Sequence, residues 1–259
     1  VAAKAMPVIC EVDETLTIDP ADIEKKITPA TKAIVAVHMR GVPCNMDAIL
    51  AIAEKHNLKV IEDCAQSYCC KYKGKYAGTF GDIGCFSLND FKHISAGDGG
   101  MIVTDNEELY YKALMFADKN FNRLGPDVVK NVPYLAPNYR INELTSAVAL
   151  AQLDKVEDIC AKRNAYGNKL NAALQNIKGL YPHKVLDGCD CSWWFYMLRI
   201  NEEEIGTTRS EFCKALSAEG IICYEGYIPS CVYQYDMFKN KHFYPGETQC
   251  PADGTYGRS

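Results

Sequence analysis

The chain has 259 residues, a formal net charge of −5, 48% hydrophobic residues and 24% charged residues. This length supports a full hydrophobic core, in one large domain or in one domain and a half. The mild negative charge gives no electrostatic case for binding nucleic acid or an anionic membrane surface. No window approaches the roughly 18 apolar residues that a membrane-spanning helix needs, and no signal peptide opens the sequence. We therefore expect a cytoplasmic protein that binds neither nucleic acid nor membranes.

The thirteen cysteines are the unusual feature of the composition. None forms a Cys-x-x-Cys pair, and the five histidines show no zinc-ligand spacing, so we expect no metal site. Many lie in apolar runs, such as Cys85 within residues 83–88, where cysteine is a small hydrophobic side chain. An odd number without a secretion signal favours reduced thiols. Cys189-x-Cys191 and Cys69-Cys70 are the local candidates for a metal or redox role.

Strand and helix signals alternate through the first half of the chain, which predicts a mostly parallel α/β sheet. The continuous apolar run at 33–38 is typical of a strand covered on both faces. Gly74, Gly78 and Gly81 punctuate a hairpin-like piece. In chain order, we expect a strand at 6–12, a helix from Asp19-Pro20 to Ile27, a strand at 33–38, a helix at 46–56 capped by Asn45, strands at 58–63, 83–88 and 101–104, and a helix carrying 109–116 behind a capping box at 104–107.

The pattern changes at Asn142. Apolar residues recur at helical spacing from Leu144 to Val156, and this helix is predicted to continue past Arg163 toward Ile177, long enough to bridge two domains. Further on, we expect a core strand at 193–200 that includes Trp193 and Trp194, a helix opened by a capping box at 208–211, and a strand at 221–224. We therefore predict part of a large domain at residues 1–155 and a smaller α+β domain at 156–259 that includes the bridging helix.

Chemistry-bearing residues follow two of the predicted strands. Asp63 ends one strand, Ser87 ends the next, and Lys92 comes five residues later, before the turn at 97–100. Open α/β sheets bind their ligands at the carboxyl ends of strands. Singly, these residues would be a solvated lysine, a helix cap and a strand end. Together they offer a pyridoxal phosphate site an amine for the aldehyde, an acid for the pyridine nitrogen and a hydroxyl for the phosphate.

Ordered motifs carry a family resemblance. They are Val60-Ile61-Glu62-Asp63-Cys64-Ala65-Gln66, Gly81-Asp82-Ile83-Gly84-Cys85-Phe86-Ser87, Lys92-His93, Gly97-Asp98-Gly99-Gly100, Asn138-Tyr139-Arg140-Ile141-Asn142-Glu143 and Ala149-Leu150-Ala151-Gln152-Leu153. They resemble the DegT/StrS family of pyridoxal-phosphate-dependent sugar aminotransferases over nearly the whole chain. The resemblance implies a type I aminotransferase fold and a homodimer with shared active sites. It also implies amino transfer from glutamate or glutamine to a keto-sugar, nucleotide-linked by preference, or to a keto-cyclitol.

The resemblance also implies residue roles, with pyridoxal 5′-phosphate as cofactor. Lys92 would form the Schiff base and shuttle the proton, and Asp63 would pair with the pyridine nitrogen. Gln66 would lie against the ring, and Ser87 would bind the phosphate. Asn138 would reach the phosphate of the partner subunit's cofactor.

The sequence also departs from the family pattern. The family's first phosphate-binding turn, of Ser-Gly-Thr type, and the aromatic residue that stacks on the cofactor belong upstream of Val1. We therefore expect a longer gene product whose remainder completes the site and also extends the carboxyl end. Arg140 has the alternative role of bracing the loop that carries Asn138.

Other readings stay open at this point. A sugar dehydratase on the same fold carries histidine in place of the lysine, whereas here His93 only follows Lys92. A lyase would need a mobile cysteine near the cofactor, and the sequence does not single one out. A non-catalytic sensor would hold the cofactor or a sugar without turnover. The aromatic segments at 226–229 and 233–238 would line the substrate entrance or serve as core and interface residues.

Overall fold

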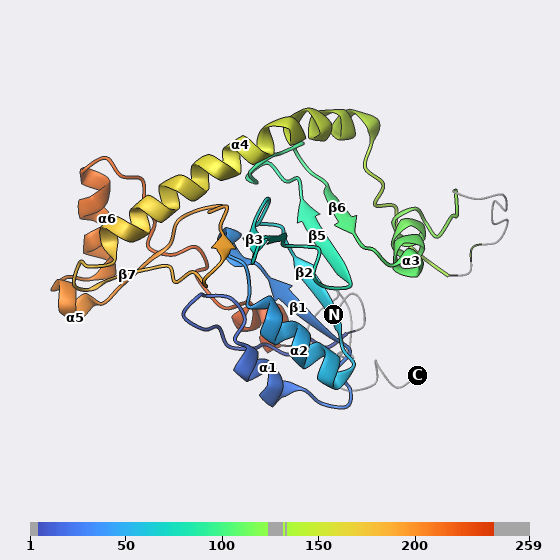
Figure 1. Ribbon diagram of the computed structural model, residues 1–259, viewed down its shortest axis with the longest axis horizontal. Helices are drawn as coiled ribbons and strands as arrows, with labels where there is room; N and C mark the ends of the chain where they lie inside the picture. The colour runs from blue at the N-terminus through green and yellow to red at the C-terminus, as the bar shows by residue number, and fades with distance from the viewer. Residues whose placement is uncertain (1–4, 124–131, 133, 241–259) are drawn as a thin grey trace. The chain divides into compact units, whose positions relative to one another are not determined.

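The computed structural model describes residues 5–123, 132 and 134–240 (Figure 1). The chain divides into two compact units. The larger comprises residues 10–199, and the smaller combines residues up to Ile9 with those from Ile200 onward. The boundary predicted at residues 155–156 falls inside α4 (Glu143–Leu174), which belongs wholly to the larger unit. The predicted division into two functional domains stays a prediction.

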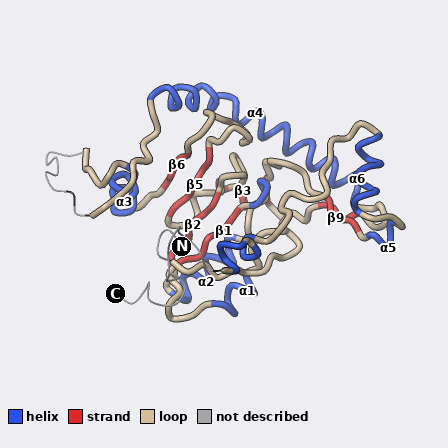
Figure 2. The backbone as a smooth tube through the Cα atoms, turned by 180° about the vertical axis from the view of Figure 1, so that it is seen from behind, coloured by secondary structure: helices blue, strands red, loops and turns tan. Residues whose placement is uncertain are grey.

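A four-stranded sheet forms the centre of the larger unit, in the order β1-β2-β5-β6. The strands β1 (Ala33–Val37), β2 (Lys59–Asp63) and β5 (Ile83–Ser87) run parallel, and β6 (Gly100–Val103) is antiparallel to β5. Figure 2 shows these strands side by side. The prediction of a mostly parallel α/β sheet is confirmed, and its register aligns the carboxyl ends of β2 and β5.

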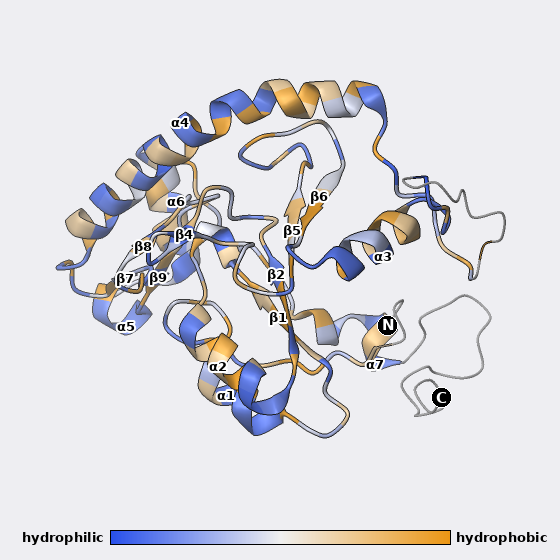
Figure 3. Cartoon of the chain, turned by 45° about the vertical axis from the view of Figure 1, so that its right-hand side comes forward, coloured by the Kyte–Doolittle hydropathy of each residue, from blue (hydrophilic) through white to orange (hydrophobic). Residues whose placement is uncertain are grey.

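Two helices pack against this sheet, and a long third helix packs against the segments that follow its strands. The helix α1 (Pro20–Lys26) is capped by the Asp19 side chain, and α2 (Met46–His56) by that of Asn45. These helices bury Ile23 and Ile49 against the strands, together with Val60. Figure 3 shows hydrophobic residues along β5 and in α2. Beyond the carboxyl ends of the strands, α4 packs Val156 and Cys160 against the segments that follow β2 and β5 (Figure 1).

The remaining elements are short. In the larger unit they are η1 (Met39–Gly41), β3 (Lys71–Tyr72), β4 (Lys75–Tyr76), α3 (Glu107–Ala117), β7 (Leu180–Pro182), β8 (Cys189–Asp190) and β9 (Leu198–Ile200), the last of which ends at the unit boundary. The smaller unit holds α5 (Glu202–Ile205), α6 (Arg209–Ala218), η2 (Val232–Gln234) and α7 (Asp236–Lys239). The capping box predicted at Thr208 and Glu211 is confirmed at the start of α6. None of the helices described is both long and apolar enough to cross a membrane.

Several predicted strands are wrong. Residues 6–12 form only an isolated bridge between Val12 and Ile18, and residues 221–224 form no strand. Their large side chains are exposed, with Val8 at 61% and Ile222 at 85%, and β-propensity without a neighbouring strand and a buried face does not make a strand. The strand predicted at 193–200 shortens to β9: Trp193 has a φ of +44°, and residues 194–197 pair with no strand.

The start of α3 also differs from its prediction. Asn106, not Thr104, caps this helix, because its side chain accepts the amide of Leu109. The Thr104 hydroxyl donates instead to the carbonyl of Asp82, at 2.6 Å. The same hydroxyl accepts the amide of Asn106 at 3.1 Å, so Thr104 fixes the turn before the helix rather than its first turn.

Candidate active site

Asp63 and Ser87 lie at the carboxyl ends of neighbouring parallel strands. Asp63 is the last residue of β2 and pairs in register with Cys85, two residues before Ser87 at the end of β5. The Asp63 carboxylate accepts a hydrogen bond from the backbone N–H of Ala65, and the Ser87 hydroxyl accepts one from the backbone N–H of Asn89. Both side chains are half-buried. The structure thus places an acid and a hydroxyl at one edge of the sheet, where ligands of open α/β folds bind.

Lys92 lies in the loop beyond β5, half-buried. Burial lowers the pKa of its ammonium below the usual value, and the negative charge of Asp63 opposes this effect. The Lys92 Nζ lies 4.4 Å from the centroid of the Trp194 ring, and the Trp194 indole donates to the carbonyl of Phe91. Lys92 is therefore an amine of lowered basicity that also interacts electrostatically with Asp63. A lysine acts as a nucleophile only when its basicity is lowered in this way.

Gln66 is held by the backbone of η1. Its Oε1 accepts the amide of Arg40 at 2.9 Å, which fixes the plane of the carboxamide. Arg40 has a φ of +59°, a left-handed conformation that few residues other than glycine adopt. A strained turn that orients a side chain near Asp63 is typical of a functional site.

A buried carboxylate beneath the site was missed by the sequence analysis. The fully buried Glu62 accepts the amides of Gly78, Phe80 and Gly81 at 2.6–2.7 Å and the Nε2 of His38 at 2.9 Å. Burial raises the pKa of Glu62, but these hydrogen bonds outweigh it, so the pKa lies below its usual value. The period-two pattern of β2 places Glu62 on the same face as Val60, which is the signal that could have revealed its burial.

His38 completes this arrangement. Its Nδ1 accepts the amide of Cys44 at 3.0 Å, so its proton is on Nε2, which donates to Glu62. Its own amide donates to the carbonyl of Asp63. His38, Glu62 and Cys64 place potential ligand atoms within 4.8 Å of one another, but backbone amides already occupy the Glu62 oxygens and the His38 Nδ1. We therefore interpret the cluster as a hydrogen-bonded support for the end of β2.

Asn138 is exposed and belongs to a separate cluster on the segment before α4. Arg140 donates from Nε to the Asn138 Oδ1 at 3.2 Å and to the Asp118 Oδ1 at 3.0 Å. Asp118 also pairs with Lys119 and Arg123, and these hydrogen bonds lower its pKa to about 2. Arg140 thus braces the Asn138 loop. Within the described residues, no hydrogen bond joins Asn138 to Lys92, the predicted catalytic residue.

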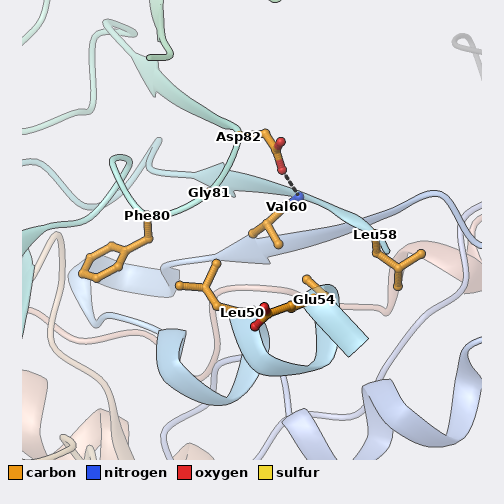
Figure 4. A pocket seen from close by; sticks show the side chains of 8 residues that line it. Leu50, Glu54, Leu58, Val60, Phe80, Gly81 and Asp82 are labelled. Atoms are coloured by element: carbon orange, nitrogen blue, oxygen red, sulfur yellow. Dashed lines mark hydrogen bonds between the residues drawn. The ribbon is translucent and has the colours of Figure 1, made fainter. Parts of the chain in front are cut away.

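A hollow of about 370 Å³ lies elsewhere in the larger unit (Figure 4). Figure 4 shows Asp82 at its rim, where the carboxylate accepts the Val60 amide at 2.8 Å. Its lining comes from α2, the start of β2 and the turn before β5: Leu50, Ala53, Glu54, Leu58, Val60, Phe80, Gly81 and Asp82. None of the predicted site residues is among them, so the hollow is not the chemical centre.

The sequence matches the profile of the DegT/DnrJ/EryC1/StrS aminotransferase family over residues 1–256. The chain belongs to this family. Pyridoxal 5′-phosphate is the cofactor associated with the family, and a dehydratase structure from E. coli, 27% identical with a TM-score of 0.73 over 83% of this chain and 58% of its own, has hydrated cofactor bound.

Curated relatives and other solved structures agree with this assignment. The chain is 37% identical to the spore coat polysaccharide biosynthesis protein SpsC of Bacillus subtilis, covering 83% of this chain and 57% of the relative. It is 40% identical to GDP-perosamine synthase of Escherichia coli O157:H7, covering 66% of this chain and 48% of the relative. An aminotransferase from Psychrobacter cryohalolentis superimposes with a TM-score of 0.82 at 29% identity, over 94% of this chain and 66% of its own. These matches confirm the predicted type I aminotransferase fold. The chain spans about half the length of its curated relatives.

Proposed function

We propose that the protein is a pyridoxal-phosphate-dependent aminotransferase that moves an amino group from glutamate or glutamine to a keto-sugar. The observation that carries this proposal is Lys92, an amine whose pKa burial lowers while it remains within reach of the Asp63 charge, beside the carboxyl ends of β2 and β5. The residues present suit the cofactor, because an amine, an acid and a hydroxyl converge on one sheet edge.

Pyridoxal phosphate, when bound, supplies the electron sink that acidifies the α-hydrogen of an amino acid. The part taken by this chain is proton handling and positioning. Lys92 in its neutral form would accept a proton from the substrate carbon and return it as the ammonium, and its lowered pKa makes the neutral form easier to reach than in an exposed lysine. The Asp63 carboxylate would keep the pyridine nitrogen protonated, and Gln66 would lie against the ring. Ser87 would hold the phosphate through its hydroxyl.

The acceptor we favour is a nucleotide-linked keto-sugar, with a keto-cyclitol as the second candidate. The support is the 40% identity to GDP-perosamine synthase, a protein named for a nucleotide-linked sugar. We further propose a cytoplasmic homodimer in which Asn138, braced by Arg140 and Asp118, reaches the phosphate of the partner subunit's cofactor.

A dehydratase is less well supported. In that reaction a histidine would take the position of the lysine side chain. His93 is 6% exposed and its Nε2 donates to the carbonyl of Ser192 at 3.1 Å. Its ring also packs against Tyr68. A side chain fixed in the core in this way does not replace Lys92.

The test is the visible spectrum of the purified full-length protein with pyridoxal phosphate, before and after addition of glutamate or glutamine. We expect a yellow band that bleaches with the amino donor, and Lys92→Ala should abolish both the band and the turnover. Lys73→Ala is the matched control, because Lys73 is 60% exposed and pairs with Asp47. Normal turnover in Lys92→Ala would refute the proposal, and a band that ignores both donors would favour a dehydratase, lyase or sensor.

A further inference from the structure

Two cysteines lie together where α4 packs against the loop that follows β2. Cys160 is on α4, 4% exposed, and its thiol donates to the carbonyl of Tyr68 at 3.4 Å. Cys69 is the next residue after Tyr68, and it packs against the same cluster as Cys160. The Cys160 thiol thus contacts the residue that precedes Cys69, and both cysteines belong to one packed cluster. Cys69 is half-buried, so one member of the pair is open to solvent and the other is not.

The two thiols differ in acidity. Hydrogen bonding from Cys160 lowers the pKa of Cys69 below its usual value, while that same contact and burial raise the pKa of Cys160. Among the described cysteines with a resolved shift, Cys69 is the one whose pKa falls. The pKa of each of the others is raised, with burial as the first cause except at Cys160. The thiolate is the reactive form of cysteine, and an accessible acidic thiol next to a second thiol is the arrangement of redox-sensitive pairs.

We propose that Cys69 and Cys160 form a reversible disulfide when the protein meets hydrogen peroxide. The Cys69 thiolate attacks one peroxide oxygen, the O–O bond breaks, and two electrons pass from sulfur to oxygen. This leaves a sulfenic acid on Cys69 and releases hydroxide. The Cys160 thiol then attacks the Cys69 sulfur, forming the S–S bond, and its proton leaves with the departing hydroxyl as water.

The neighbouring cysteine is a poor alternative partner. The Cys70 thiol is buried, donates to the carbonyl of Gly41 at 3.0 Å and contacts the Ser192 hydroxyl at 3.1 Å. Burial raises its pKa to about 12. The reactive pair therefore joins α4 to the loop that carries Gln66, rather than two adjacent residues of that loop.

The chain contains a matched control pair. In α6, the carbonyl of Cys213 accepts the thiol of Cys223 at 3.3 Å, so these two cysteines are also adjacent. The pKa of Cys213 is raised, with burial as the first cause. If proximity alone decided the reaction, both pairs would form disulfides at equal rates. If the acidity of the attacking thiol decides it, the disulfide between Cys69 and Cys160 forms faster.

The experiment treats the full-length protein with hydrogen peroxide and maps its disulfides by mass spectrometry of a non-reduced digest. We expect one cross-linked species joining the peptides of Cys69 and Cys160, lighter by two hydrogens and reversed by dithiothreitol. Cys160→Ala should leave a Cys69 sulfenic acid that dimedone traps, and Cys69→Ser should leave Cys160 reduced. Cys231→Ser, at an exposed thiol, should not change the product.

Three results would overturn the proposal. They are a Cys213–Cys223 bridge that forms as fast, a Cys69–Cys70 bridge, or a Cys69 that resists peroxide and dimedone in Cys160→Ala. Circular dichroism of each variant separates loss of fold from loss of reactivity. The cross-link in the unsubstituted protein decides the question even where a variant does not fold.

Discussion

At the scale of single residues, the buried carboxylate of Glu62 holds the site together. Its oxygens accept three backbone amides and His38, and no water reaches them. Glu62→Gln replaces one acceptor oxygen with a donor that faces other donors, so we expect the free energy of unfolding to fall by about 3 kcal/mol or more. Urea titration measures this.

Glu54→Gln is the control for that substitution, because Glu54 is exposed on α2. A surface change of this kind alters stability by about 0.5 kcal/mol or less. Equal losses in the two variants would show that the Glu62 network contributes nothing particular to stability.

The sequence predicted some of these residues and not others, for a physical reason. Asp63 and Ser87 lie at strand ends as predicted. A strand end is marked by the change from apolar to polar residues in the sequence nearby. The partners of Glu62 lie 16 to 24 residues away in the sequence. Trp194, predicted for a core strand, lies over Lys92 through a contact between residues about a hundred positions apart. Local periodicity contains no information about such contacts.

At the scale of elements, α4 depends on its single glycine. Gly167 is buried where the helix meets Trp193, and a Cβ at this position would lie 2.3 Å from the Trp193 Nε1. Gly167→Ala gains about 1 kcal/mol of helix propensity but overpacks a site, at a cost of about 1–3 kcal/mol. The indole cannot move aside easily, since the rings of His183 and Tyr196 flank it.

We therefore expect Gly167→Ala to destabilise the protein by up to about 2 kcal/mol despite the better helix former. Thermal or urea unfolding measures the change. Lys169→Ala, at an exposed position of the same helix, is the control and should be nearly neutral. A stabilised Gly167→Ala would mean that Trp193 has room to shift.

Elements whose capping and packing signals agree were predicted well. The helix α2 begins after Asn45 as its sequence indicates, and its apolar face meets β1 and β2. Residues 193–200 have an apolar strand pattern, but the left-handed Trp193 packs against α4 and breaks the extended backbone. Tertiary packing overrides local preference there.

At the scale of the whole molecule, two buried histidines make the stability of the fold depend on pH. His93 donates from Nε2 to a carbonyl, and its buried Nδ1 has no partner among the described residues. Burial lowers its pKa to about 4. Burial also lowers the pKa of His183, whose Nε2 donates to the carbonyl of Thr15. Both rings are therefore neutral in the folded chain at pH values where they would be charged in the unfolded chain.

These lowered pKa values make the folded protein less stable in acid. Between about pH 6.5, the usual histidine value, and pH 4, the unfolded chain binds a proton at position 93 that the folded chain does not, so stability falls as the pH falls. The contribution of His93 is complete above about pH 6.5, and the loss down to pH 4 is about 3 kcal/mol. Urea unfolding at about pH 7.5 and about pH 4.5 measures it. His93→Gln should flatten the profile within this window, and a profile equally steep in that variant would place the titrating group elsewhere.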